Sequence, residues 1–242
     1  MARAPTLFIS DLHLSPERPA LVEAFHALVA GPARGAAALY VIGDLFDVWL
    51  GDDQLREPLA AGVARTFAGL AATGTPVSLQ RGNRDFLLGQ RFARAAGATL
   101  LDDAVVHDVQ GTPTLIMHGD ALCTDDVDYQ RFRAYWQDPV HRRRLLALPY
   151  VFRRGIAAFF RARSKRATAS KPEAIMDINA GAVADALRRH GVTRLIHGHT
   201  HRPGRHELTV DGRACERYVL ADWYRSASYL RVDGAGVTAC AL

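Results

Sequence analysis

Apolar and polar residues form two alternating patterns along the chain, short apolar runs and longer segments with helical spacing. Five short runs, at residues 7–9, 39–42, 77–79, 115–117 and 195–197, have the length of buried strands. Between them, apolar residues recur with the period of an amphipathic helix at residues 19–30, 56–72, 89–96 and 179–190. This alternation of strand and helix predicts βαβ units and a parallel sheet.

Beyond His201 the pattern changes to short β-rich runs. These runs lie at residues 218–220, 228–232 and 237–242, and turn residues such as Asp233 and Gly234 separate them. Runs of this kind are typical of antiparallel strands. The chain as a whole therefore predicts a mixed-sheet α/β fold.

Each of the five short runs is followed by residues that can bind metal ions. Ligand sites of open α/β sheets lie beyond the carboxyl ends of the strands, so these residues are expected to meet in one place. A single Asp or His after a strand is usually a turn or capping residue, but seven in succession favour a metal site. The seven are Asp11, His13, Asp44, Asn83, His118, His199 and His201.

The spacing and the residue types indicate the kind of metal site. Asp11 and His13 are two residues apart, as are His199 and His201, so each pair points the same way if the extended conformation continues. Asp44 follows a glycine, where the backbone can approach closely, and is the candidate bridging carboxylate. Nitrogen and oxygen ligands without thiolate favour Mn²⁺, Fe²⁺ or Zn²⁺. The pattern predicts a two-metal hydrolase.

Residues 121–171 interrupt the alternation of strand and helix and carry much of the positive charge. Between positions 139 and 172 there are ten Arg or Lys and no Asp or Glu, so the rest of the chain has a net charge of −5 although the whole chain has +5. Such a block is a solvated face, a nucleic-acid patch or a surface for phosphates and anionic lipids. The apolar run at 145–160 predicts short helices that form a cap over the metal site. Their apolar side either packs on the core or lines a groove rimmed by Arg.

Length and composition limit the organisation of the chain. The 242 residues, of which 49% are hydrophobic, can bury one sizeable core, which predicts a single domain over residues 1–242 that includes the insertion. The sequence has no apolar run of about 18 residues and no signal-peptide pattern, so we expect a cytoplasmic protein, or one on the cytoplasmic side of a membrane. The widely spaced Cys123, Cys215 and Cys240 predict reduced thiols in the core.

Five motifs that contain the candidate ligands resemble those of the calcineurin-like metallophosphoesterases. Within that superfamily, residues 82–89, 118–126, 175–177 and 195–203 resemble the UDP-2,3-diacylglucosamine hydrolases of lipid A biosynthesis. The match spans almost the whole chain. The five motifs are Asp11-Leu12-His13, Gly43-Asp44-Leu45-Phe46-Asp47, Gly82-Asn83-Arg84-Asp85, His118-Gly119-Asp120 and Gly198-His199-Thr200-His201.

The resemblance implies a sandwich of two mixed sheets flanked by helices, with residues 121–171 as a helical cap insertion. It also implies two divalent ions, Mn²⁺ above all, and attack of an activated water on the phosphorus nearest uridine in UDP-2,3-diacylglucosamine. The products would be UMP and 2,3-diacylglucosamine 1-phosphate, or lipid X. The implied ligand sets are Asp11, His13, Asp44 and His201 for one ion, and Asp44, Asn83, His118 and His199 for the other.

The same resemblance implies partners and a location. The protein would lie peripherally on the cytoplasmic side of the inner membrane, where its lipid substrate is. It would need neither nucleic acid nor an obligate protein partner. If it does not bind the membrane, it is expected in the cytoplasm.

Arg84 refines the expected chemistry. Many members of the superfamily carry His, a leaving-group acid, at this position. Arg does not release its proton at ordinary pH, but its planar guanidinium binds phosphate oxygens in a bidentate manner. Because a phosphate leaving group needs little protonation, Arg84 favours a pyrophosphate substrate. Asp44 and Arg84 are therefore the candidate catalytic residues.

The resemblance also assigns substrate contacts to seven positions. Asp125 and Asp126 could instead cap a helix: the two interpretations are balanced for Asp125, whereas substrate contact is favoured for Asp126. Several aromatic residues, Phe86 and Phe132 among them, line an acyl groove or belong to the core. The seven contact positions are Asn83, Arg84, Asp126, Ser164, Thr168, Lys171 and His199.

Two other functions stay open. A metallophosphoesterase acting on nucleotides or nucleic acid could use the basic block to bind phosphates, although apolar residues interleaved with the Arg residues favour lipid. A non-catalytic scaffold of the same fold is the second alternative. The complete set of seven ligand residues argues against it.

Overall fold

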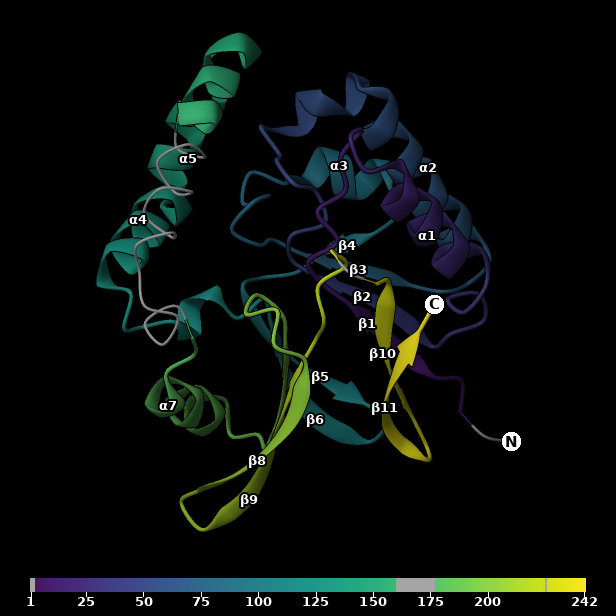
Figure 1. The fold of residues 1–242 in the computed structure, drawn as a ribbon, viewed down its shortest axis with the longest axis vertical. Coiled ribbons are helices and arrows are strands. Elements are labelled where there is room, and N and C mark those ends of the chain that lie inside the picture. Colours follow the sequence, from purple (N-terminus) through teal and green to yellow (C-terminus); the bar gives the residue numbers. More distant parts are fainter. Residues whose placement is uncertain (1–2, 160–176, 225) are drawn as a thin grey trace.

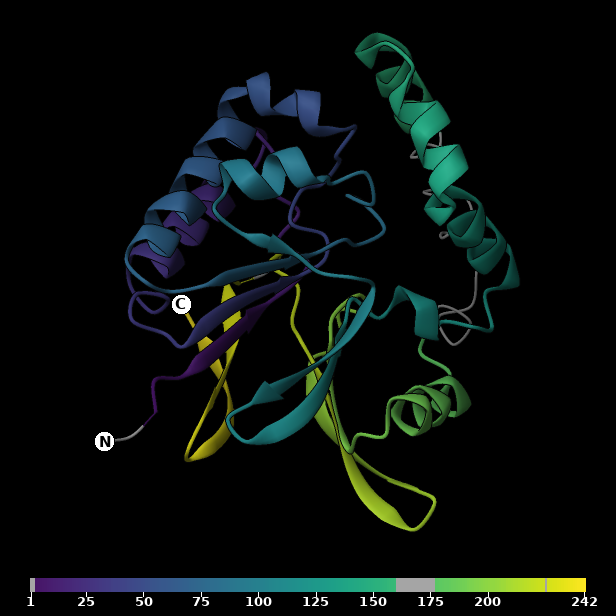
Figure 2. The same ribbon diagram turned by 180° about the vertical axis from the view of Figure 1, so that it is seen from behind.

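The computed structural model describes residues 3–159, 177–224 and 226–242. Two β-sheets pack face to face, helices α1–α3 cover the outer face of one sheet, and α7 covers the outer face of the other (Figures 1 and 2). The expected sandwich of two mixed sheets flanked by helices is confirmed. None of the helices formed by the described residues is long and apolar enough to cross a bilayer.

The first sheet has six strands in the order β11-β10-β1-β2-β3-β4. Its four strands from β1 to β4 are parallel, whereas β10 pairs with β1 and β11 in the antiparallel sense. Because parallel strands require crossover connections, helices separate β1, β2, β3 and β4 along the chain. The strands are β1 (Thr6–Ile9), β2 (Ala38–Ile42), β3 (Val77–Gln80), β4 (Thr99–Leu100), β10 (Ser228–Asp233) and β11 (Gly236–Ala241).

The second sheet has five strands in the order β5-β6-β7-β9-β8. β6, β7 and β9 are parallel neighbours, and hairpin partners flank them on both sides. Neither β5 nor β8 was predicted. The apolar run of β5 is only three residues long, and β8 lacks an apolar run because most of its residues are exposed and two are charged. The strands are β5 (Ala104–Val109), β6 (Thr112–Met117), β7 (Arg194–His197), β8 (Gly204–Val210) and β9 (Arg213–Val219).

Alternate residues of the central strands face different layers of the molecule. In β1, Leu7 and Ile9 contact the helices α1–α3, whereas Phe8 lies between the two sheets. In β6, Leu115 packs towards α7, whereas Ile116 lies between the sheets. Because these strands are buried on both faces, they appear in the sequence as continuous apolar runs rather than alternating ones.

The helices of the sandwich lie close to the ranges predicted from the periodicity. α1 begins and ends at the predicted residues, and α7 begins one residue after its N-cap Asn179, whose side chain accepts a hydrogen bond from the amide of Ala182. α2 begins later than expected because the preceding residues form the 3₁₀ helix η1. The elements are α1 (Pro19–Ala30), η1 (Asp52–Arg56), α2 (Pro58–Ala72), α3 (Gln90–Ala95) and α7 (Ala180–His190).

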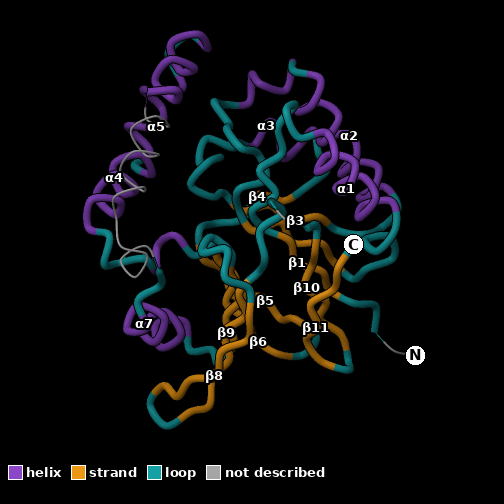
Figure 3. Tube along the Cα trace, in the orientation of Figure 1, coloured by secondary structure: helices purple, strands orange, loops and turns teal. Residues whose placement is uncertain are grey.

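The basic segment after β6 is helical where the structure describes it. It contains the 3₁₀ helix η2 (Asp120–Leu122), α4 (Val127–Gln137), α5 (Pro139–Leu146) and helical residues 150–159. α4 and α5 run along one side of the molecule, opposite the group α1–α3 (Figures 1 and 2). Loops that follow the strands lie between these two groups of helices (Figure 3).

One basic residue of this segment does not belong to a solvated face. Arg153 is buried, with 5% of its side chain exposed, and forms an ion pair with Asp53 of η1. Its guanidinium also donates to the backbone oxygens of Leu50 and Leu148. The nearby Tyr150 hydroxyl donates to Glu57. Arg153 therefore ties the helical residues 150–159 to the η1 loop, and its interpretation as part of a lipid- or phosphate-binding surface is wrong.

We predict that Arg153→Met loosens the helical residues 150–159 while leaving the sandwich intact. The substitution removes the cationic donor of two carbonyl groups and leaves the Asp53 carboxylate with the longer ion pair to Arg56 at 3.5 Å, which costs about 2–3 kcal/mol. Hydrogen exchange measured by mass spectrometry should be faster in residues 139–159 and unchanged in β1–β3. Arg154→Met, at an exposed neighbour, is the matched control. Equal exchange rates in the two variants would contradict this anchoring role.

Candidate metal centre

The candidate ligands lie in loops that leave the strands in an unusual backbone conformation. Seven non-glycine residues of the described chain have positive φ, and five of them are candidate ligands. A left-handed backbone is unfavourable for such residues and is concentrated at functional sites. The prediction that the extended conformation of the strands continues through these residues is therefore wrong, although the two ligands of each pair still converge. The five are Asp11, His13, Asp44, His199 and His201.

Two glycines allow the loops to approach one another. A Cβ atom at Gly43 would overlap the imidazole of His118, and one at Gly82 would overlap the carboxylate and amide of Asp44. Gly43 also has φ +92°, which favours glycine. The close approach inferred from the glycine before Asp44 is thus present, and a ligand imidazole fills the space.

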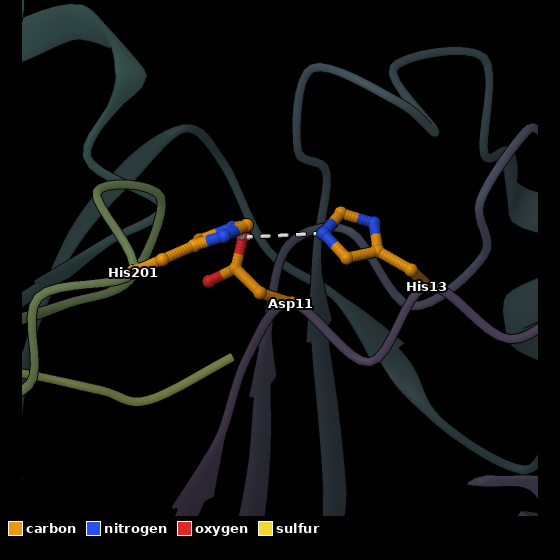
Figure 4. A group of neighbouring side chains, drawn as sticks. All are labelled: Asp11, His13 and His201. Atoms are coloured by element: carbon orange, nitrogen blue, oxygen red, sulfur yellow. Dashed lines mark hydrogen bonds and ion pairs between the residues drawn. The ribbon is translucent and has the colours of Figure 1, made fainter. Parts of the chain in front are cut away.

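Asp11 lies between two histidines that come from opposite ends of the chain (Figure 4). Its Oδ1 is 3.3 Å from Nε2 of His201 and 4.0 Å from Nε2 of His13. Its Oδ2 accepts hydrogen bonds from the Ser10 hydroxyl at 2.5 Å and from the amide of His199 at 2.9 Å. Asp11 is fully buried, so these contacts replace the water that a carboxylate would otherwise bind.

A second group surrounds Asp44 and Asn83. Oδ1 of Asp44 is 3.8 Å from Nε2 of His118, whereas its Oδ2 is 3.8 Å from Nδ1 of His13. The Asn83 amide oxygen is 3.1 Å from Nε2 of His118 and 2.9 Å from Nδ1 of His199. These contacts join the second group to the first through Asp44 and His13. The structure therefore brings all seven candidate ligands into one cluster.

The pKa values of the ligands Asp11 and Asp44 are shifted in opposite directions. Burial raises the pKa of Asp44 well above its ordinary value, and the nearby carboxylates of Asp85 and Asp11 add to this shift, which His118 opposes. Burial also disfavours ionised Asp11, but the hydrogen bond with His201 and the charges of His118 and His201 lower its pKa overall. The cluster is therefore short of positive charge at Asp44, which a bound cation would supply.

The histidines of the cluster are held in different charge states. Burial lowers the pKa of His13 to about 3, and burial with the charge of His118 lowers that of His199 to about 4. Both are therefore neutral imidazoles at pH 7, the form that binds metals. Burial would lower the pKa of His118 as well, but the carboxylates of Asp44 and Asp11 raise it to about 9. A cation would have to displace a proton from His118.

The ligand atoms fit divalent metal ions. Both ring nitrogens of His13 are buried and have no hydrogen-bond partner in the described structure. Buried polar atoms are normally paired, and a metal ion would satisfy one of these nitrogens. The cluster offers imidazole nitrogen, carboxylate oxygen and amide oxygen without thiolate, which is a donor set for Mn²⁺, Fe²⁺ or Zn²⁺.

Arg84 lies at the edge of the cluster, next to Asp44 in space. Its amide donates to Oδ1 of Asp44 at 2.8 Å, and its carbonyl accepts from the amide of Trp49. Its side chain is 38% exposed and forms an ion pair with Asp47 at 3.3 Å. The backbone of Arg84 is therefore fixed, while its guanidinium faces the solvent beside the ligand cluster.

Two supporting carboxylates were not predicted as functional. Asp85 is fully buried and accepts hydrogen bonds from the amides of Leu45 and Gly82 at 2.8 and 2.7 Å, which holds two ligand loops together. Asp222 lies 3.3 Å from Nδ1 of His201 and so orients that ring. Asp85 follows the predicted ligand Asn83 closely and could have been suspected, but no spacing in the sequence relates Asp222 to His201.

A third carboxylate connects the cluster to helix α4. Asp120 is buried and accepts from the Tyr129 hydroxyl at 2.9 Å and from Nε of Arg133 at 2.7 Å. The Tyr129 ring is nearly parallel to that of His199, with centroids 6.2 Å apart. Helix α4 is thereby fixed beside one group of ligands.

The predicted substrate contacts outside the cluster are only partly described. Asp126 is the N-cap of α4, and its Oδ1 accepts a hydrogen bond from the amide of Tyr129 at 3.1 Å. The prediction that Asp126 does not cap a helix is therefore wrong. Asp125 does not cap this helix and accepts from the Asn179 amide group. Three positions, Ser164, Thr168 and Lys171, lie outside the described residues.

The chain is similar to a known protein family, to named proteins and to solved structures. The family model for calcineurin-like phosphoesterase matches residues 4–203. A protein of Aromatoleum aromaticum named UDP-2,3-diacylglucosamine hydrolase is 50% identical over 230 residues, which are 95% of this chain and 94% of that protein. A Stenotrophomonas maltophilia protein of the same name is 46% identical over 238 residues and 96% of each chain. A solved archaeal phosphodiesterase aligns with 98% of this chain and 99% of its own at 12% identity and a TM-score of 0.49.

The family match covers most of the chain, and it includes every one of the seven clustered ligand residues. The two named relatives extend the similarity over almost the full length. This chain is therefore a metal-dependent hydrolase that belongs to the calcineurin-like phosphoesterase family.

Proposed function

We propose that this protein hydrolyses the pyrophosphate bond of UDP-2,3-diacylglucosamine to UMP and 2,3-diacylglucosamine 1-phosphate, or lipid X. The observation that carries the proposal is the position of Arg84, whose partly exposed guanidinium lies beside the cluster of seven candidate metal ligands. The names of relatives that are about half identical over nearly the whole chain support this substrate.

The metal centre would hold two divalent ions, which we propose to be Mn²⁺. Asp11, His13, Asp44 and His201 would hold one ion, and Asp44, Asn83, His118 and His199 the other. When bound, such a pair lowers the pKa of a water molecule and neutralises charge on the phosphoryl group. The neutral state of His13 and His199 and the buried carboxylates support this assignment.

We assign the bridging position to Asp44. Its two oxygens face different imidazoles, Oδ1 towards His118 and Oδ2 towards His13, each at 3.8 Å. The amide of Arg84 also donates to Oδ1 and limits rotation of the carboxylate. A carboxylate with one oxygen directed to each ligand group is suited to bind both ions at once.

Arg84 would bind and orient phosphate oxygens of the substrate. Its guanidinium keeps its proton, so it stabilises negative charge on the departing phosphate rather than protonating it. Asp47 holds the guanidinium at 3.3 Å, and a bidentate phosphate contact would replace or share this ion pair. A pyrophosphate suits such a residue better than an ester with an alkoxide leaving group.

The acyl chains would occupy the space beneath the cap. Phe86 is two residues from Arg84, and its ring centroid is 6.3 Å from that of Trp136 in α4. Phe132, one turn earlier in α4, is 37% exposed and lies 6.2 Å from Trp136. A cation and a group of apolar rings therefore lie next to each other, as a phospholipid-like substrate requires.

We propose peripheral binding to the cytoplasmic face of the inner membrane. Val151 and Phe152, in the helical residues 150–159, are 76% and 65% exposed, and Arg154 beside them is also exposed. Exposed apolar side chains with neighbouring cations are typical of helices that lie at a membrane surface. The remaining proposed substrate contacts are Asn83, Asp126, Ser164, Thr168, Lys171 and His199, and we propose that residues 121–171 act as a cap within one domain spanning residues 1–242.

We expect purified protein with Mn²⁺ to cleave UDP-2,3-diacylglucosamine in preference to single-stranded DNA or bis-nitrophenyl phosphate. Mass spectrometry of the products should find UMP and not UDP, because attack is on the phosphorus nearest uridine. Asp44→Ala should abolish turnover and lower metal content, and chelation should do the same reversibly. Preference for either of the other substrates, or release of UDP, would contradict the proposal. Metal-loaded protein without any pyrophosphate hydrolysis would favour a scaffold.

We predict that Arg84→Ala lowers kcat by about 10²–10³-fold, because one preorganised charge on the reacting phosphate is lost. Metal content, measured by mass spectrometry of the digested protein, should stay at that of the unchanged protein. Arg84→Lys should recover part of the activity, since it keeps the charge but not the bidentate geometry. Loss of metal from Arg84→Ala would show that the residue supports the ligands instead.

We predict that Val151→Asp combined with Phe152→Asp weakens binding to vesicles of phosphatidylethanolamine and phosphatidylglycerol by tenfold or more. Burying each apolar side chain contributes about 1.5–3 kcal/mol, and the new charges repel the anionic surface. Sedimentation with vesicles measures the effect. Val106→Asp, at an exposed position of β5, is the control. Equal binding of both variants would mean that the cap helix does not contact the membrane.

A further inference from the structure

Two of the ligand histidines have a second contact that orients the imidazole ring, and His13 has none of that kind. Nδ1 of His118 lies 3.0 Å from the carbonyl oxygen of Ile42, and Nδ1 of His201 lies 3.3 Å from Asp222. Hydrogen bonds of this type usually fix the orientation of metal-binding histidines. Neither nitrogen of His13 has a hydrogen-bond partner in the described residues.

An aromatic contact takes the place of the missing hydrogen bond. The Tyr224 ring stacks on the His13 imidazole, with centroids 4.9 Å apart and planes 25° from parallel. The same ring also contacts the Arg18 guanidinium, whose Cζ is 4.3 Å from the ring centroid, and the His201 ring, with centroids 5.7 Å apart. A ring stacked near-parallel on the imidazole restricts its rotation, and the nearby cation stabilises the phenol ring.

The position of Tyr224 is itself fixed by its neighbours. Trp223 is fully buried, its indole donates to the carbonyl of Ser228, and its amide donates to the carbonyl of Asp11. Asp222 contacts His201. Three consecutive residues of the loop between β9 and β10 thus contact Asp11, His13 and His201, which belong to one ligand group.

We infer that Tyr224 is a positioning residue for His13 and supports the ion held by Asp11, His13, Asp44 and His201. This inference rests on the proposed two-metal centre. Tyr224 is 39% exposed, so its ring is not needed to fill the core. Its ring contacts His13 and His201, and both histidines belong to this group. Tyr129 lies against His199 of the other group.

Titration with Mn²⁺ alone tests the inference without measuring activity. Isothermal calorimetry and electron paramagnetic resonance should find two ions in the unchanged protein. In Tyr224→Leu the Kd of one ion should rise by about 10–100-fold while the other ion still binds. Tyr224→Phe keeps the ring and should bind both ions within about twofold of the unchanged protein. Tyr135→Leu, at a half-exposed aromatic residue of α4, is the control and should also bind both.

Each outcome supports or overturns a distinct statement. Wild-type affinity for both ions in Tyr224→Leu overturns the positioning role, and so does an equal loss in Tyr224→Phe, which would assign the effect to the hydroxyl group. Fewer than two ions in the unchanged protein overturns the proposed metal centre instead. Circular dichroism checks folding of the metal-free variants. If Tyr224→Leu does not fold, Arg18→Gln decides, since loss of the cation should weaken the same ion, and unchanged binding overturns the inference.

Discussion

The burial of Asp11, Asp44 and Asp85 in one small volume is the constraint on which the rest of the structure depends. Carboxylates without water are strongly disfavoured unless hydrogen bonds or positive charges compensate them. Asp85 accepts hydrogen bonds from backbone amides. Asp11 accepts them from a hydroxyl group, a backbone amide and the imidazole of His201. Asp44 has one backbone donor, and its pKa is raised. The fold therefore leaves a deficit of positive charge at the carboxylate that faces both ligand groups.

The loops that bring these groups together are possible because the strands beneath them are rigid. Strands β1, β2 and β6 are buried on both faces, which fixes the points where Asp11, Asp44 and His118 leave the two sheets. Left-handed backbone at five ligands and glycines at the closest approaches cost conformational energy. Packing of the sandwich offsets this cost, so ligand geometry is largely set before an ion binds.

Local patterns predicted the fold better than they predicted individual side chains. The buried strands and α1 could be predicted because burial produces apolar runs or periodic apolar positions in the sequence. The exposed, charged strand β8 has no such pattern. The seven ligands were found from residue type and strand order, even though the assumed extended backbone was wrong. The prediction of a solvated or ligand-binding role for Arg153 was wrong because its partner Asp53 is a hundred residues away in the sequence. Only the tertiary structure reveals this ion pair. Tyr224 was missed for the same reason.

The two ligand groups are supported in different ways. Residues 222–224 contact the group of Asp11, His13 and His201 through an ion pair, a backbone hydrogen bond and a stacked ring. The other group lies beside α4, whose Arg133 donates to Asp120, while Arg153 joins the helical residues 150–159 to η1 through Asp53. The described helices after β6 are therefore attached to the sandwich at two separate places. Because both attachments are largely buried ion pairs, we expect movement of these helices to be limited.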